Sequence, residues 1–332
     1  MTKNILITGP ALVPAAEAVL TEAHYTPIYV PPYTEGAGLL DLVAKARPLG
    51  VLVRMGRLDE AFFAAATEVQ VLSKHGAGVD NIDLEAASAR NIPVLVAAGA
   101  NAVSVAEHAM ALLFAVAKKI VPLDQGMRAG RWEKPGFQGR ELAGSTMGLV
   151  AFGAIARQTA RYARAFGMDV VAYDPFCPAE VFAAEGVARI EDLDDLLAQS
   201  DIISLHSPLT PDTRQMINAD RLARMRRDAI IINTARGGLI DEDALLAALV
   251  AGQIAGAGLD TFAHEPAAAN HPFWAEMRLV VTPHIGGVTA AANARVGIEA
   301  AQGIVDFLAG RDIPHSRIVN HRRLAPATQA AS

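Results

Sequence analysis

The sequence predicts an α/β protein built on two parallel sheets, each covered by helices on both faces. Short apolar runs rich in β-branched residues alternate with segments of helical periodicity. One set of runs lies before about residue 100, and a second extends from about 145 to 285. Continuous apolar runs of this length are typical of strands that are buried on both faces, as in a doubly wound sheet. With 332 residues, the chain has room for about two such domains.

The predicted elements follow one another in a regular order. We expect strands at 4–8, 50–54, 69–74, 93–96, 148–152, 169–173, 202–206, 229–233, 255–259 and 279–282. We expect helices at 14–23, 59–66, 83–90, 104–119, 154–166, 192–199, 220–225, 241–251 and 290–308. The glycine-rich stretch 122–144 shows no periodicity and is expected to be an irregular interaction arm or a surface linker. From residue 325 onward the chain has no apolar anchor, which predicts a frayed tail.

Composition excludes several classes of function. The 29 Lys and Arg against 35 Asp and Glu give a net charge of −6, so the chain lacks the positive charge expected of a nucleic-acid-binding protein. The apolar runs are interrupted before the roughly 18 to 20 residues that a membrane span needs, so we expect no membrane partner. The single cysteine, Cys177, cannot form an intrachain disulfide, which agrees with a cytoplasmic protein.

A strand that runs into a helix start carries the cofactor signal. Residues 151–156 read Ala-Phe-Gly-Ala-Ile-Ala, which keeps the middle glycine of a GxGxxG dinucleotide motif but has alanine at both outer positions. Asp174 ends the next predicted strand, about 20 residues after Gly153. At this spacing in a dinucleotide site, an acidic side chain accepts hydrogen bonds from the adenosine ribose hydroxyls. Because a carboxylate repels a 2′-phosphate, NAD is favoured over NADP. These residues alone also allow a structural turn beside a surface aspartate.

Three later strand ends carry the candidate catalytic side chains. Segments 233–238, 259–266 and 282–287 each place an ionisable side chain beside glycine or proline. Parallel strands bring their carboxyl ends to one edge of a sheet, so Arg236, Glu265 and His284 are expected to share a site.

Seven segments in order along the chain resemble the D-isomer-specific 2-hydroxyacid dehydrogenase family, which includes phosphoglycerate, glycerate, hydroxypyruvate and D-lactate dehydrogenases. They are 75–83, 104–108, the Gly153 turn with Asp174, 206–210, 234–237, Leu259-Asp260 with Glu265-Pro266, and 282–287. The resemblance implies a Rossmann NAD-binding domain at 101–290, inserted in a flavodoxin-like substrate domain formed by 1–100 and 291–320, with a tail at 321–332. It also implies a homodimer with an oligomerisation arm at about 120–145.

The resemblance further implies hydride transfer between nicotinamide and a small D-2-hydroxy acid or 2-keto acid. His284 would be the general acid, Glu265 would favour its protonated form, and Arg236 would hold the substrate carboxylate and carbonyl oxygen. Asp260 would orient the nicotinamide carboxamide. The other implied cofactor-binding residues are Gly153, Ala154, Ile155, Asp174, His206, Pro208, Thr213, Thr234, Ala235, Arg236, His284, Gly286 and Gly287. The implied substrate-binding residues are Arg54, Ala77, Gly78, Arg236 and His284.

Two other functions are alternatives. The first is a formate- or phosphite-type oxidation, and Glu265 argues against it because the formate branch has a glutamine at this position. A non-catalytic NAD-sensing scaffold of the corepressor type keeps the same three side chains. Only the lack of a low-complexity, partner-binding extension counts against it.

The substrate stays open among phosphoglycerate, hydroxypyruvate or glyoxylate, and other anionic 2-hydroxy acids such as sulfolactate. Arg54 and Arg57, with Lys74 and His75, are expected either to meet a second anionic group or to be surface charges. The sequence indicates no metal site. No partner is evident for three histidines, which we expect to be structural: His108, His264 and His271.

Overall fold

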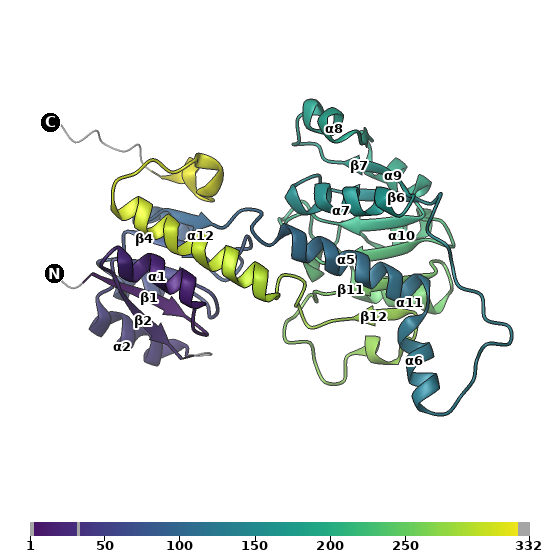
Figure 1. The fold of residues 1–332 in the computed structure, drawn as a ribbon, viewed down its shortest axis with the longest axis horizontal. Coiled ribbons are helices and arrows are strands. Elements are labelled where there is room, and N and C mark those ends of the chain that lie inside the picture. Colours follow the sequence, from purple (N-terminus) through teal and green to yellow (C-terminus); the bar gives the residue numbers. More distant parts are fainter. Residues whose placement is uncertain (1–2, 32–33, 325–332) are drawn as a thin grey trace. The chain divides into compact units, whose positions relative to one another are not determined.

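The computed structural model describes residues 3–31 and 34–324, which fall into two compact units (Figure 1). One unit contains the residues up to Asn101 together with those from Thr289 onward, and the other is Ala102–Val288. The second unit is therefore inserted into the sequence of the first. The division falls after Asn101 and Val288, where the sequence suggested 100 and 290.

The first unit is built on a five-stranded parallel sheet with the strand order β2-β1-β3-β4-β5, which is the flavodoxin-like order. Two separate apolar clusters pack within this unit, and helix α12 lies beside α1 (Figure 1). The strands are β1 (Asn4–Thr8), β2 (Thr26–Val30), β3 (Gly50–Val53), β4 (Val71–Lys74) and β5 (Val94–Val96). The helices are α1 (Pro14–Glu22), α2 (Gly36–Ala46), α3 (Glu60–Ala65), α4 (Leu84–Ala89) and α12 (Ala290–Leu308).

Burial explains why residues from both ends of the chain form one unit. Ile5 and Ile7 of β1 are fully buried, as expected for a strand that is covered on both faces. Helix α12 places Ala300 and Ile304 in the same apolar cluster as these two residues. Helix α12, far along the sequence from β1, is thus part of the core of the first unit.

The segment after α12 is fixed by Asn320, whose side chain is buried. Its Oδ1 accepts the Val94 N–H at 2.9 Å, and its Nδ2 donates to Ile92 O at 2.9 Å. A short 3-10 helix follows at His321–Arg323, so the tail predicted from residue 321 begins with regular structure. The rest of the predicted tail, 325–332, lies outside the described residues.

The second unit carries a seven-stranded parallel sheet with the order β12-β11-β10-β9-β6-β7-β8. Counted from β6, this is the Rossmann order with a seventh strand added, and the topological switch point lies between β6 and β9. The strands are β6 (Thr146–Val150), β7 (Asp169–Tyr173), β8 (Ala188–Arg189), β9 (Ile202–Leu205), β10 (Ile230–Asn233), β11 (Gly256–Leu259) and β12 (Leu279–Val281). The helices are α5 (Ala102–Ala117), α6 (Ile120–Arg128), α7 (Ala154–Ala165), α8 (Ala179–Glu185), α9 (Leu193–Gln199), α10 (Ala219–Arg224) and α11 (Glu242–Val250).

The prediction that 122–144 is irregular was wrong in its first part. Helix α6 occupies Ile120–Arg128, and only 129–145 lacks a helix or strand. Pro122 misled the sequence analysis, because proline usually ends a helix. Here it stands in the first helical turn, where its missing N–H has no intrahelical partner to lose.

Four further elements were not predicted: β2, α2, α8 and β8. Strand β2 contains Pro27, which a sheet tolerates only at an edge, and β2 is an edge strand. Helix α2 begins with Gly36 and Gly38, which resemble a loop in the sequence. Within the described ranges, no helix combines the length and apolar character needed to cross a bilayer.

Candidate active site

The turn between β6 and α7 forms a potential anion site. Gly153 is the N-cap of α7, and a Cβ atom added there would meet nothing within 4 Å. The first-turn amides of Ala154 and Ile155 lie beside this open space, where unpaired N–H groups and the helix dipole favour a phosphate. Ala151 has a φ of +71°, a left-handed conformation that favours glycine, at a cost of about 1 to 2 kcal/mol. Ala156, in the first turn of α7, is fully buried.

Asp174 follows β7 and is held by three backbone amides. Its Oδ2 accepts the Phe152 N–H at 2.8 Å, and its Oδ1 accepts the N–H groups of Phe176 and Cys177 at 2.9 and 3.1 Å. The bond from Phe152 ties this carboxylate to the Gly153 turn. A helix N-terminus with an acid after the next strand fits a pyrophosphate and the adenosine ribose of NAD.

Replacing Asp174 by alanine is expected to weaken NADH binding by about tenfold or more, because a charged acceptor for the ribose hydroxyls is lost. NADPH binding is expected to weaken less or to improve, since the carboxylate that repels the 2′-phosphate is gone. Fluorescence titration with each nucleotide measures the two dissociation constants, and their ratio gives the preference for NADH over NADPH. Asp169→Ala, at the opposite end of β7, is the matched control. Equal changes for NADH and NADPH would contradict this role of Asp174.

The loop after β10 positions Arg236. Asn233 is fully buried, and its Oδ1 accepts the Ala235 N–H at 3.0 Å while its Nδ2 donates to Arg236 O at 2.8 Å. These two bonds fix the turn from which the Arg236 side chain extends. In the same turn, the Thr234 hydroxyl is buried and has no hydrogen-bond partner among the described residues. A bound cofactor would satisfy such a group.

Gly237 allows the Arg236 loop to pack directly against the loop that carries Glu265. A Cβ atom at position 237 would lie 1.9 Å from Phe262 C and 2.3 Å from Ala263 N. Backbone therefore packs on backbone at this point. The charge of Arg236 acts on Glu265 from the adjoining loop and contributes to lowering the pKa of that carboxyl.

The structure brings His284 and Glu265 together. His284 Nδ1 lies 2.7 Å from Glu265 Oε2, and Glu265 Oε1 accepts the Phe262 N–H at 3.0 Å. Burial alone would raise the pKa of Glu265, but these two hydrogen bonds and the charges of His284 and Arg236 lower it overall. An ionised Glu265 only accepts hydrogen bonds, so His284 Nδ1 carries a hydrogen and Nε2 is the atom left to exchange a proton.

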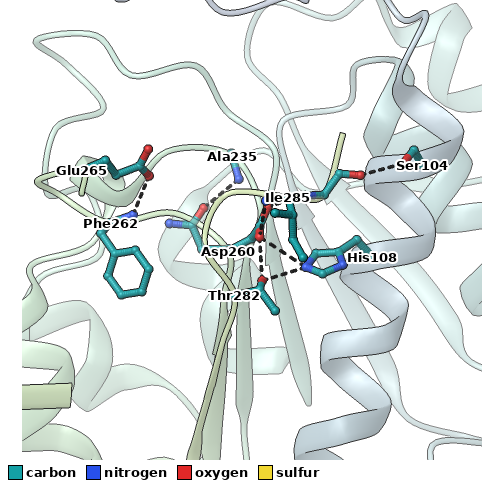
Figure 2. A network of polar contacts seen from close by, with 10 residues as sticks. Ser104, His108, Ala235, Asp260, Phe262, Glu265, Thr282 and Ile285 are labelled. Atoms are coloured by element: carbon teal, nitrogen blue, oxygen red, sulfur yellow. Dashed lines mark hydrogen bonds and ion pairs between the residues drawn. The ribbon is translucent and has the colours of Figure 1, made fainter. Parts of the chain in front are cut away.

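Asp260 is almost fully buried after β11, and its carboxylate organises the turn that follows β12 (Figure 2). Oδ1 accepts the Thr282 hydroxyl at 2.6 Å and the Ile285 N–H at 2.9 Å, and Oδ2 accepts the Gly286 N–H at 2.7 Å. Burial would raise the pKa of Asp260, but hydrogen bonds from His108, Thr282 and the two amides lower it. A nicotinamide carboxamide could use only the remaining acceptor capacity of Oδ2.

Helix α5 also contributes to this site, which was not predicted from the sequence. Ser104 Oγ donates to Gly286 O at 2.7 Å, and His108 Nε2 lies 2.8 Å from Thr282 Oγ1 (Figure 2). His108 was expected to lack a partner. The available signal was the spacing of four residues, which places Ser104 and His108 on the same face of a mostly apolar helix.

A second anchor holds the loop that carries Glu265. Glu242, at the start of α11, accepts the Ala263 N–H at 2.8 Å and lies 3.4 Å from His271 Nε2. The His271 ring also packs against Trp274, with 5.3 Å between ring centroids. His271 thus supports the loop.

The loop after β9 contains three implied cofactor residues. His206 Nε2 lies 3.0 Å from Ser204 Oγ. Thr213 Oγ1 donates to Pro208 O at 2.7 Å and accepts the Thr210 N–H at 2.7 Å. The single hydroxyl proton of Thr213 is used within the loop, and this residue shapes the chain around Pro208.

Burial lowers the pKa of His206 to about 4, from the ordinary value of about 6.5 in an unfolded chain. Between these values the unfolded chain binds more protons, so His206 is expected to make the protein less stable as the pH falls from about 6.5 to 4. Urea unfolding measures the free energy of unfolding across this pH range. In His206→Gln this free energy should fall less than in the unaltered protein, by on the order of 1 to 3 kcal/mol. His75, whose pKa is also lowered to about 4, remains in both proteins. Parallel pH curves would contradict this assignment.

In the first unit, the candidate substrate residues follow β3 and β4. Arg54 Nη1 donates to Pro10 O and Ala11 O at 2.5 and 2.8 Å, which holds the guanidinium against the turn after β1. Lys74 Nζ donates to Asn81 Oδ1 at 2.7 Å. Burial lowers the pKa of Arg54, but a guanidinium stays charged at neutral pH.

The segment after β4 provides backbone amides. Gly76 has a φ of +138°, which favours glycine, and leads the chain into Ala77 and Gly78. Neither of the latter two amides is hydrogen-bonded within the described residues, so both can donate to a ligand. Burial and the charge of Arg54 lower the pKa of His75, which is therefore neutral near pH 7. Across the described ranges, no group of three or more His, Cys, Asp or Glu side chains is arranged to hold a metal ion.

Comparison with known proteins identifies the family. Residues 110–286, slightly more than half of the chain, match the sequence model of the D-isomer specific 2-hydroxyacid dehydrogenase, NAD binding domain. The chain belongs to this family. The matched span lies within the second unit and includes the Gly153 turn and the three candidate catalytic side chains Arg236, Glu265 and His284.

Related members of the family carry several names. A hydroxypyruvate reductase of Thermotoga maritima is 44% identical over 242 residues, which is 72% of this chain and 78% of that protein. A D-3-phosphoglycerate dehydrogenase of Mycobacterium tuberculosis is 41% identical over 257 residues, or 77% of this chain and 48% of that protein. The chain thus spans about half the length of the phosphoglycerate dehydrogenases it matches.

A crystal structure of a Thermus thermophilus protein superposes with a TM-score of 0.85 at 34% identity, covering 95% of this chain and 99% of that one. The predictions of the family, of the paired parallel-sheet fold and of NAD as the cofactor are confirmed. For this 2-hydroxyacid dehydrogenase family member, the roles of individual side chains remain predictions.

Proposed function

We propose that the chain is an NAD-dependent oxidoreductase that transfers a hydride between the nicotinamide and C2 of a small D-2-hydroxy acid or 2-keto acid. The 2.7 Å hydrogen bond between His284 Nδ1 and Glu265 Oε2 carries this proposal, because it prepares an imidazole for proton exchange. The pair lies in the same unit as the Gly153 turn, within the NAD-binding domain. The names of the reductase and dehydrogenase relatives support the substrate class.

Proton movement is assigned to His284. Bound NAD supplies the hydride donor or acceptor. Glu265 holds His284 Nδ1–H, so Nε2 gives a proton to the substrate oxygen during reduction and takes it back during oxidation. The lowered pKa of Glu265 keeps this residue ionised near neutral pH, so Oε2 can accept the hydrogen on His284 Nδ1.

Substrate anchoring is assigned to Arg236. Its guanidinium offers donors in a planar fork that matches a carboxylate, and it stays charged throughout the working pH range. The two hydrogen bonds of Asn233 fix the backbone from which this side chain extends. We assign to Arg236 the binding of the substrate carboxylate and the polarisation of the C2 oxygen, and this fixed backbone supports the assignment.

Within this class, we propose a substrate with a second anionic group, such as a phosphate, sulfonate or carboxylate. Arg54 follows β3 and Lys74 is the last residue of the adjacent parallel strand β4, so both lie at the carboxyl edge of the sheet of the first unit. Arg54 uses Nη1 for backbone carbonyls, and its other donors have no partner among the described residues. Those donors would suit a second anion.

The test is NADH oxidation, followed by absorbance, with glyoxylate, hydroxypyruvate, pyruvate, oxaloacetate, 3-sulfopyruvate and phosphohydroxypyruvate. NADPH serves as the parallel cofactor. Turnover with any of these acids and NADH supports the proposed reaction, and a preference for a doubly anionic acid supports the finer proposal. Silence across the panel with intact NADH binding would favour the sensing scaffold.

Arg54→Met is expected to lower kcat/KM for a doubly anionic acid by about 10 to 100 fold, because a charge-assisted hydrogen bond is lost. The value for glyoxylate should change much less, since glyoxylate has no second anionic group. Arg57→Met, at an exposed position three residues later, is the matched control. Equal losses for both kinds of substrate would argue against a second anion at Arg54.

We also propose a cytoplasmic homodimer, with 120–145 as the oligomerisation arm. The arm exposes several large apolar side chains that a partner copy would cover: Ile120, Val121, Met127, Trp132 and Phe137.

A further inference from the structure

Two polar side chains on one face of α5 contact the turn that carries His284. Ser104 is buried, and its Oγ donates to Gly286 O at 2.7 Å. His108 lies one helical turn later, with its Nε2 2.8 Å from Thr282 Oγ1. Helix α5 therefore holds both ends of this turn, at Thr282 and at Gly286 (Figure 2).

The proton positions in this cluster follow from its donors and acceptors. Asp260 is ionised near neutral pH, because four hydrogen bonds outweigh the effect of burial and lower its pKa. Thr282 has one hydroxyl proton and donates it to Asp260 Oδ1 at 2.6 Å. The Thr282 oxygen must therefore accept the hydrogen on His108 Nε2. His108 Nε2 also lies 3.3 Å from Asp260 Oδ1, so its N–H supports the buried charge.

The turn needs support because its central residue is strained. His284 has a φ of +55°, a left-handed conformation that is unfavourable for a residue with a side chain. Its amide donates to Asp260 O at 2.7 Å, and the amides of Ile285 and Gly286 donate to the Asp260 carboxylate. The last two bonds depend on the orientation of the carboxylate, which His108 helps to set.

We propose that Ser104 and His108 are positioning residues that clamp the 282–286 turn and thereby hold His284 in line for proton exchange. The proposal rests on the proposed dehydrogenase function. The two side chains act through Thr282 and Asp260 at one end of the turn and through the backbone at its other end. Neither is assigned a contact with the substrate.

The first test is steady-state kinetics of the full chain. His108→Ala is expected to lower kcat by about 10 to 100 fold and to change the KM for NADH by less than about threefold, because misplacement affects the chemical step most. His108→Gln can donate an N–H near the position of Nε2 and is expected to recover most of the loss. Ser104→Ala should lower kcat by about 3 to 10 fold. Glu107→Ala, exposed on the same helix, is the control.

The second test is amide hydrogen exchange and does not depend on turnover. Peptides covering 282–288 are expected to exchange at least about tenfold faster in His108→Ala, while peptides covering α7 keep their rates. An unchanged kcat, an unchanged exchange rate, or a glutamine variant as poor as the alanine variant would overturn the clamp. If His108→Ala does not fold, Ser104→Ala decides by the same two readouts. An inactive unaltered protein would count against the proposed function only, because the exchange data would still decide about the clamp.

Discussion

His284→Ala is expected to lower kcat for the preferred 2-keto acid by about 10² to 10⁴ fold, which is the usual contribution of a positioned general acid. The imidazole is the group that Glu265 prepares, through the 2.7 Å bond at Nδ1, to exchange a proton at Nε2. NADH binding is expected to stay within about threefold, because the Gly153 turn and Asp174 are separate structures at other strand ends. Stopped-flow NADH oxidation and fluorescence titration measure the two quantities.

His264→Ala is the matched control for this prediction. His264 is an exposed histidine next to Glu265, and no hydrogen bond or ion pair of its side chain is found among the described residues. It should retain activity close to that of the unaltered protein. If His284→Ala also retained most of its activity, the assignment of His284 as the general acid would be wrong.

The edge of the sheet that carries the site could be predicted from sequence for a physical reason. Parallel strands bring their carboxyl ends to one edge, so the residues that follow each apolar run are placed together without knowledge of packing. Gly153, Arg236 and His284 all follow predicted strands, and each lies where the strand order puts it. The starts of some helices could also be predicted from the sequence. Asp59 and Asp241 are the N-cap residues of α3 and α11, and aspartate is a preferred residue at that position.

Contacts between distant segments could not be read in this way. The bond between His108 and Thr282 joins a helix face to a strand end, and only tertiary packing decides which residues of α5 face β12. Strand β2 and helix α6 were not predicted because each contains a proline, Pro27 or Pro122. Each proline stands at the one kind of position, an edge strand or a first helical turn, where its missing N–H costs little.

Gly237→Ala is expected to be the most damaging small substitution in the loops around the site. Its Cβ would lie 1.9 Å from Phe262 C, and neither backbone can give way without moving Arg236 or Glu265. We expect kcat to fall by about 10² fold or more, because a shift of about 1 Å in a catalytic group has that effect. Overpacking should also lower the free energy of unfolding by about 1 to 3 kcal/mol.

Gly238→Ala provides the control, because it adds the same methyl group to the next residue of the loop. There the Cβ would lie 2.9 Å from Leu209 Cδ2, the far end of a side chain that can change its rotamer. Steady-state kinetics and urea unfolding of both variants separate the two effects. Full activity in Gly237→Ala would show that the Arg236 and Glu265 loops need no direct backbone contact. A loss of activity in Gly237→Ala but not in Gly238→Ala would mean that Gly237, by having no side chain, sets the distance of Arg236 from Glu265 and His284.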